Sequence, residues 1–237
     1  LVKKGIESIT ISLINSFANP AHEYQIRDIA KQVAPKIPVT CSYDVLPQFR
    51  EYERAETAVL NSYIRPNVSR YLHNLETKLK SAKLKAILNV LRSDGGLMSV
   101  HAAEDKPVNL LMSGPSGGVT GALFIAKRAG LPNMMTFDMG GTSTDVSLNM
   151  GEASIGRETN IATFASQNTV LPIKVASVDV RTIGAGGGSI AHVPALTKAL
   201  RIGPMSAGAD PGPACYGKGG TAPTVTDANV VLGHLPP

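Results

Sequence analysis

The chain has 237 residues, 43% of them hydrophobic and 17% charged, so it can bury a normal core in one large domain or two small ones. Tryptophan is absent and aromatic residues make up only 5%, which leaves aliphatic side chains to build that core. The net charge is +5, but the basic residues are spread out, and their densest cluster, Lys78 to Lys85, is typical of a solvated helix face. Without an aromatic-basic motif we expect no nucleic-acid binding, and no apolar run reaches the length of a membrane span.

The two cysteines, Cys41 and Cys215, are far apart and follow neither a disulfide framework nor a zinc-binding pattern. We therefore expect reduced thiols in a cytoplasmic protein. Cys215 could act as a nucleophile, but no histidine lies near it in the sequence. A buried, small hydrophobic side chain is the alternative reading of Cys215.

The first forty residues predict a βαβ unit. An alternating apolar pattern indicates a strand over residues 6–14. Asn19 and Pro20 are typical of a helix cap followed by proline in the first turn, and the helix should end before Pro35. A short strand over residues 38–41 would complete the unit.

A long helical region follows, and we expect Pro66 to interrupt it. The charged cluster at its start, residues 51–56, is typical of a solvated helix face. After it we expect a buried strand over residues 86–91, a turn at residues 93–96 and a loop over residues 101–107.

Residues 113–118, Ser-Gly-Pro-Ser-Gly-Gly, precede an apolar stripe that predicts a helix ending at Gly130. A glycine-serine loop at a helix N-terminus can bind an anion. Alternatively, the small residues serve only to let this helix pack closely against another. The sequence leaves both readings open.

Residues 134–148 are the most informative stretch. An apolar run ends in Asp138, and a second, alternating run starts at Asp145, so the pattern predicts strand, turn, strand. The turn consists of glycines and hydroxyl residues: Gly140, Gly141, Thr142, Ser143 and Thr144.

The chemistry of this turn suits a magnesium nucleotide. Glycines let the backbone approach a bulky anion, and exposed N–H groups and hydroxyls can donate to it. Asp138 and Asp145 would repel phosphate unless a divalent cation lay between them and it. The alternative is an ordinary hairpin with a Gly-Gly turn. The turn is not a P-loop, because no Gly-Lys-Ser/Thr is present and a strand follows.

Residues 184–188, Gly-Ala-Gly-Gly-Gly, indicate close backbone approach to a ligand or to another strand. Asp179 and Arg181 precede this segment and are either catalytic or a simple ion pair. Residues 203–217 are rich in glycine and proline, and we expect an ordered loop packed on a site. Thr226 and Asp227 indicate the cap of a final helix.

Taken together, these motifs resemble the hydantoinase A and 5-oxoprolinase family, within the ATPase superfamily of actin, sugar kinases and heat-shock chaperones. The resemblance covers nearly the whole chain. The segments that carry it, in this order, are Arg50-Glu51-Tyr52-Glu53-Arg54, Ser113-Gly114-Pro115, residues 137–148, residues 184–189, residues 203–217 and Thr226-Asp227-Ala228-Asn229.

The resemblance implies an α/β, ribonuclease-H-like fold, with a mixed sheet and flanking helices, and an ATP-dependent enzyme. Such enzymes phosphorylate a poorly reactive oxygen and then open a cyclic amide of the hydantoin or 5-oxoproline type with water. A related branch carboxylates acetone or acetophenone instead. A non-catalytic nucleotide-binding subunit is a further alternative.

The site residues are carried over by position. Asp138 and Asp145 would organise Mg²⁺, and Asp179 is a third catalytic candidate. The phosphates of ATP would lie on the turn formed by Gly140, Gly141, Thr142, Ser143 and Thr144. Ser113 and Gly114 would line the cleft, and Gly186, Gly187 and Gly188 would lie near the nucleotide or the substrate. No general base is assigned.

One departure concerns extent. Members of the family carry another Asp-Gly-Gly-Thr hairpin near their N-terminus, and none occurs here. We therefore expect an incomplete segment, inactive alone, with residues 1–48 closing an N-terminal domain and residues 49–237 forming a truncated ATPase-like domain. The family also implies a B-type partner subunit or a homo-oligomer, and no membrane partner.

Overall fold

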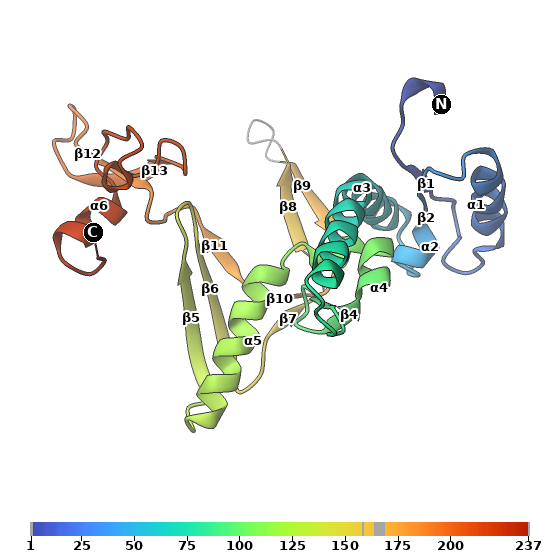
Figure 1. Ribbon diagram of the computed structural model, residues 1–237, viewed down its shortest axis with the longest axis horizontal. Helices are drawn as coiled ribbons and strands as arrows, with labels where there is room; N and C mark the ends of the chain where they lie inside the picture. The colour runs from blue at the N-terminus through green and yellow to red at the C-terminus, as the bar shows by residue number, and fades with distance from the viewer. Residues whose placement is uncertain (1, 158, 164–168, 237) are drawn as a thin grey trace. The chain divides into compact units, whose positions relative to one another are not determined.

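The computed structural model describes residues 2–157, 159–163 and 169–236 (Figure 1). It divides into two compact units, each considered by itself. Unit 1 comprises Leu1–Gly117 and Ile155–Val178, and unit 2 comprises Gly118–Ser154 and Asp179–Pro237. No helix in the described ranges is both long enough and apolar enough to cross a bilayer. The predicted division at residue 48 concerns family domains and stays a prediction.

Unit 1 opens with η1 (Val2–Lys4) and the predicted βαβ unit. Strands β1 (Ile9–Ile11) and β2 (Val39–Cys41) pair in parallel and flank α1 (Ala21–Val33). Ile11, Val39 and Cys41 form the small core between strands and helix. The N-cap residue of α1 is Pro20, so the prediction of Asn19 as the cap with Pro20 in the first turn was wrong by one residue. The Asn19 side chain accepts a hydrogen bond from the Ala21 N–H at 3.0 Å.

Helices dominate the rest of unit 1. After α2 (Ser42–Val45), α3 runs without interruption from Glu51 to Ser81. The prediction that Pro66 interrupts this helix was wrong. Proline costs one backbone hydrogen bond, but the helix packs on both sides of it, through Leu60 and Ile64 in one hydrophobic cluster and Leu72 in another.

The segment after α3 corrects two further expectations. Strand β3 (Asn89–Leu91) is shorter than predicted and partly exposed, and it forms a hairpin with β4 (Leu97–Ser99). The predicted loop over residues 101–107 is largely helical, as α4 (Val100–Asp105) followed by η2 (Pro107–Leu110). The Ser99 hydroxyl caps α4 by accepting from the Ala102 N–H.

Strands returning from later in the sequence complete unit 1. In this return, β7 (Ile155–Gly156) pairs with β10 (Ser177–Val178), and β8 (Thr159–Thr163) pairs with β9 (Thr169–Ile173), all antiparallel. Ile173 is fully buried with Val108 and Val175.

Helix α5 (Ser113–Arg128) begins in unit 1 and continues in unit 2. The predicted glycine-rich loop at residues 113–118 is therefore the first turns of the helix itself. A Cβ on Gly117 would lie 2.7 Å from Leu91 Cδ2, so glycine allows close packing on β3.

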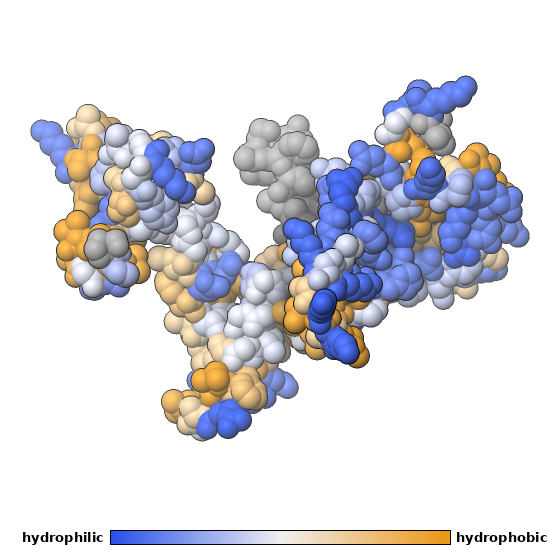
Figure 2. Space-filling model, in the orientation of Figure 1, coloured by the Kyte–Doolittle hydropathy of each residue, from blue (hydrophilic) through white to orange (hydrophobic). Residues whose placement is uncertain are grey.

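Unit 2 contains an antiparallel sheet in the order β11-β6-β5, formed by Arg181–Ile183, Thr144–Met150 and Asn133–Met139. Its alternation is unusual. Polar side chains such as Ser147 and Asn149 are buried on one face, while apolar side chains cover the other. Figure 2 shows apolar residues over β5, and the exposed ones on the hairpin are Met135, Phe137, Met139, Leu148 and Met150.

The last third of unit 2 pairs β12 (Ser189–His192) with β13 (Arg201–Ser206), followed by η3 (Ala214–Tyr216) and α6 (Val225–Val231). The predicted glycine- and proline-rich loop therefore starts inside a strand. The final helix is capped by Thr224, not by Thr226, because Thr224 and Asp227 form a capping box.

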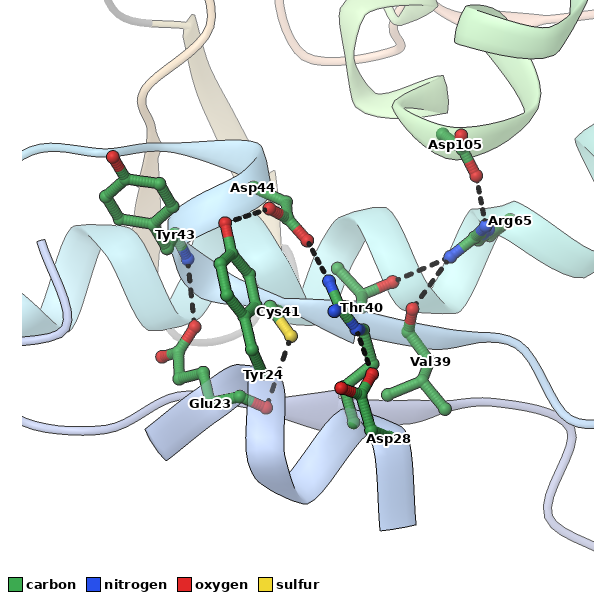
Figure 3. A network of polar contacts seen from close by, with 11 residues as sticks. Glu23, Tyr24, Asp28, Val39, Thr40, Cys41, Tyr43, Asp44, Arg65 and Asp105 are labelled. Atoms are coloured by element: carbon green, nitrogen blue, oxygen red, sulfur yellow. Dashed lines mark hydrogen bonds and ion pairs between the residues drawn. The ribbon is translucent and has the colours of Figure 1, made fainter. Parts of the chain in front are cut away.

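A buried ionic network links α1 to α3 in unit 1. Glu23 is fully buried and accepts from the Leu13 and Tyr43 N–H groups and the Ser42 hydroxyl, at 2.6–3.1 Å. Figure 3 shows the bond from the Tyr43 N–H. Ser42 in turn accepts from Arg54, which is also fully buried. The charged cluster at the start of α3 is thus not simply a solvated face.

Arg54 holds this network together, since it also donates to the carbonyls of Leu13 and Gln48 and to the Glu51 carboxylate. We predict that Arg54→Met lowers the free energy of unfolding of unit 1 by about 3 kcal/mol, because buried acceptors lose their donor. Chemical denaturation followed by hydrogen exchange of unit 1 peptides measures this. The control is Arg50→Gln, which breaks the exposed Arg50–Glu53 pair and should cost less than about 1 kcal/mol.

Glu23 predicts acid sensitivity. Burial alone would raise its pKa, but hydrogen bonds from Ser42, Leu13 and Tyr43 outweigh burial and hold the pKa below its usual value. A lowered pKa in the folded state stabilises the fold above the usual value of 4.5, and the stabilisation is lost as pH falls through the folded-state pKa. In Glu23→Gln, the free energy of unfolding, measured by urea denaturation, should therefore fall less between pH 6 and acid pH than it does in the wild type. An unchanged acid profile would contradict this role.

Candidate functional site

The register of β5 and β6 brings the two predicted metal-binding carboxylates together. Asp138 and Asp145 are direct partners in the ladder, so their side chains lie on the same face of the hairpin. The Thr182 hydroxyl, from β11, donates to Asp145 Oδ1 at 2.6 Å. Asp138 is exposed and Asp145 is half-buried.

The turn between these strands is tight. The Gly140 N–H donates to the Ser143 carbonyl at 2.9 Å. The carbonyls of Gly140 and Gly141 accept at 2.9 and 2.6 Å from the N–H groups of Gly187 and Gly188. Within the described residues, the N–H groups at positions 141–143 have no hydrogen-bond partner, so they can donate to a ligand.

The glycine segment at residues 184–188 packs backbone to backbone on this turn. A Cβ on Gly186 would lie 2.7 Å from the carbonyl oxygens of Gly140 and Gly141. A Cβ on Gly188 would lie 2.9 Å from the Gly141 oxygen. The sequence left open whether these glycines allow close approach to a ligand or to another backbone segment. In the structure they lie against the backbone of the turn.

Thr144 lies apart from the open donors of the turn. Its side chain is 2% exposed, and its hydroxyl donates to the Ala185 carbonyl at 2.6 Å. The exposed Thr142 and the half-buried Ser143 are the other two hydroxyl residues of the turn.

Asp179 and Arg181 form the predicted ion pair, with Arg181 Nε 3.4 Å from Asp179 Oδ1. Both side chains are largely exposed. A catalytic part for Asp179 stays a prediction.

The predicted residues Ser113 and Gly114 lie in the first turn of α5, in unit 1, whereas the hairpin and the glycine segment lie in unit 2. Within unit 2 the neighbour of the carboxylates is Gly118, on which a Cβ would lie 3.9 Å from Asp138 Oδ2. The sequence motif contained Gly118 but did not single it out.

Asp227 is a polar centre that the sequence presented only as a helix cap. Its carboxylate accepts from the N–H groups of Thr224, Ala214 and Cys215, at 2.8–3.3 Å. Burial would raise the pKa of Asp227, but these hydrogen bonds outweigh it and hold the pKa well below its usual value.

Cys215 is exposed, so the expectation of a buried thiol was wrong for this cysteine, whereas Cys41 is buried. The hydrogen bond from its thiol to Asp227 raises the pKa of Cys215. A raised pKa disfavours the thiolate that a nucleophile needs.

A hollow of about 1360 Å³ lies in unit 1 along α1, β2, α3 and α4. Several of its lining residues appear in the polar network of Figure 3, where Asp44 accepts from Tyr24 at 2.9 Å and Arg65 donates to the Val39 carbonyl at 3.0 Å. Lysines and arginines outnumber acidic residues here by six to four, and Arg27 and Arg65 form ion pairs with Asp44 and Asp105, respectively. Nothing in this wall gathers three metal-ligating side chains, nor does any other described part of the chain.

Two comparisons with solved structures bear on the fold. The chain superposes with a TM-score of 0.77 on the ATP-dependent caprolactamase from Pseudomonas jessenii, at 35% identity. The superposition covers 100% of this chain and 33% of the caprolactamase chain. It superposes equally well, with a TM-score of 0.77, on nucleotide-free acetone carboxylase, at 32% identity and the same coverage. The fold is thus a mixed α/β structure similar to both enzymes.

Sequence comparisons agree. Caprolactamase subunit alpha of Pseudomonas jessenii is 37% identical over 98% of this chain, and 5-oxoprolinase of Saccharomyces cerevisiae is 36% identical over 100% of it. The chain spans 32% and 18% of these relatives, respectively. The model of the hydantoinase/oxoprolinase family matches residues 54–237, and the chain therefore belongs to that family.

Proposed function

We propose that this chain carries a phosphate-binding part of an ATP-dependent enzyme that opens a cyclic amide through phosphoryl activation. The observation that carries the proposal is the pairing of Asp138 with Asp145 beside a turn whose N–H groups at positions 141–143 have no partner among the described residues. Two structural relatives support the use of ATP, because one is described as an ATP-dependent caprolactamase and the other as an acetone carboxylase that acts by ATP-dependent acetone carboxylation.

Residues of the turn fit a triphosphate and its metal. The N–H groups of Gly141 and Thr142 and the hydroxyls of Thr142 and Ser143 would donate to phosphate oxygens. Asp138 and Asp145 fit Mg²⁺, which typically takes one or two carboxylates, waters and phosphate oxygens, so two carboxylates suffice. When bound, Mg²⁺ supplies neutralisation of the negative charge on the transferring phosphoryl group.

The proposed reaction needs positioning more than a protein nucleophile. The amide oxygen of the substrate attacks the γ-phosphorus, and ADP leaves with the electron pair of the broken P–O bond. Water then adds to the carbon that bears the phosphorylated oxygen, and the ring C–N bond breaks with its electron pair and a proton going to nitrogen, which leaves as the amine and gives an acyl phosphate. A second water hydrolyses the acyl phosphate to the carboxylate and inorganic phosphate. The turn residues hold the triphosphate in line for the first step.

The finer predictions remain part of this proposal. They are the ribonuclease-H-like fold, supported by the three-stranded antiparallel sheet β11-β6-β5, a cytoplasmic location, and contributions of Ser113 and Gly114 to the nucleotide cleft. A partner subunit is supported by the name of the caprolactamase relative, which is itself a subunit alpha.

A second candidate is ATP-dependent carboxylation of a ketone, because acetone carboxylase superposes as well as caprolactamase does. Assays of the whole protein with its partner distinguish the two. Phosphate release that depends on a lactam or hydantoin, with a ring-opened product, supports the amidohydrolase. Phosphate release that depends on ketone and bicarbonate supports the carboxylase, and MgATP binding without turnover on either panel supports a non-catalytic subunit.

We predict that Asp138→Asn in the whole protein lowers ATP-dependent turnover at least about 100-fold, because the metal loses a charged ligand and the phosphoryl group its neutralisation. Circular dichroism should be unchanged, since Asp138 is exposed. The matched control is Glu152→Gln, an exposed carboxylate of the same unit, which should keep full turnover. Normal turnover by Asp138→Asn would remove the metal role.

Asp179 is separable from its ion pair by two variants. If Asp179 acts in catalysis, as proposed, Asp179→Asn loses at least about tenfold in kcat, whereas Arg181→Gln, which breaks the same pair, does not. Steady-state kinetics on the whole protein measures both. Equal, small effects of the two variants would reduce Asp179 to a surface ion pair.

A further inference from the structure

The contact between the turn and the glycine segment suggests a division of labour at the proposed nucleotide site. We infer that residues 185–188, together with Thr144, act as a clamp that orients the peptide planes of the turn toward the phosphates, and that the clamp itself does not touch the nucleotide. The inference rests on the proposed function. It changes the part expected of Gly186, Gly187 and Gly188 from binding to positioning.

The first step concerns the peptide planes of the turn. In a trans peptide, the carbonyl oxygen and the following N–H point in opposite directions. The described cis bonds are Gly203-Pro204 and Asp210-Pro211, so the peptides of the turn are trans. Because the carbonyls of Gly140 and Gly141 point at the glycine segment, the N–H groups of Gly141 and Thr142 point away from it.

The second step concerns the carboxylates. Successive side chains of a strand point to opposite faces, so Thr144 and Asp145 lie on opposite faces of β6. Thr144 donates to Ala185, which puts the glycine segment on the Thr144 face. Asp145 and its ladder partner Asp138 therefore lie on the face away from the segment, the same side to which the two N–H groups point. Phosphate donors and metal ligands thus converge on one side of the turn.

The third step concerns the hydrogen-bonding groups of the glycine segment that remain available to a ligand. The Gly186 N–H donates to the Ser189 hydroxyl at 3.0 Å, and those of Gly187 and Gly188 donate to the turn. None of these three donors is free for a phosphate. The carbonyls of Gly187 and Gly188 accept from the N–H groups of Thr226 and Ala207, at 2.7 and 2.8 Å, so the segment is held from behind as well.

The fourth step concerns space. Any side chain at position 186 would overlap the two turn carbonyls, which lie 2.7 Å from the ideal Cβ position. Relief of that overlap moves the carbonyls and rotates the N–H groups that share their peptide planes. Gly184 belongs to the same segment, but a Cβ there meets nothing within 4 Å and its backbone is not left-handed. Gly184→Ala is therefore a matched control.

The test measures affinities of the whole protein for MgATP, MgADP and adenosine by calorimetry or competition. Gly186→Ala should weaken MgATP binding about tenfold or more, as expected for an overpacked contact, and leave adenosine within about twofold. MgADP should fall between them, and Gly184→Ala should match the wild type for all three. A loss that grows with the number of phosphates is the signature of a misaligned turn.

Thr144 gives a second, milder test in case Gly186→Ala does not fold. Thr144→Val keeps the shape and removes the donor to Ala185, and it should weaken MgATP binding about fivefold, the cost of one hydrogen bond. Thr144→Ser keeps the hydroxyl and should restore binding. Faster hydrogen exchange in residues 139–146 of the free Thr144→Val protein would be the accompanying signature.

Three outcomes would overturn the inference. MgATP affinity unchanged in both Gly186→Ala and Thr144→Val would refute the clamp alone. An equal loss of adenosine and MgATP in Gly186→Ala would mean that the segment contacts the nucleoside. No MgATP binding by the wild-type protein would refute the proposed function first, and the clamp with it.

Discussion

The site depends on one backbone-to-backbone contact, in which Gly187 and Gly188 donate to the carbonyls of the turn at Gly140 and Gly141. This contact takes up the acceptors of the turn and leaves its donors open. It requires glycine at position 186, where two carbonyl oxygens occupy the space of a side chain. The proposed roles of the two carboxylates as metal ligands and of the turn N–H groups as phosphate donors depend on that one constraint, because the hairpin register then puts both groups on the same side.

Much of the architecture was predictable wherever the pattern was local. The βαβ unit, the hairpin around residues 138–145 and the final helix all follow from alternation or capping signals within a few residues. The uninterrupted α3 was not, because the packing that tolerates Pro66 comes from clusters that involve Val108 and Val100, far away in sequence. Tertiary contacts, not propensity, decide such cases.

The site divides in the same way. The residue types of Asp138 and Asp145 predicted two carboxylates that share a cation, and the ladder register puts their side chains on one face of the hairpin. The reason for the glycines at residues 184–188 could not be read from the sequence, because their neighbour lies more than forty residues earlier. The buried Arg54 looked like any charge on a helix surface. The final helix had a signal that was missed, the Thr-x-x-Asp spacing of Thr224 and Asp227 that identifies a capping box.

Under the proposed clamp, the conformation of the turn depends on residues that are distant in sequence. The sequence motif of the turn spans about a dozen residues, but its conformation depends on the glycine segment. That segment follows only after residues 155–178, which belong to the other unit. A hairpin peptide excised from the protein would keep the motif and lose the conformation. Grafting the turn onto a foreign scaffold would therefore transfer binding only if the glycine segment travelled with it.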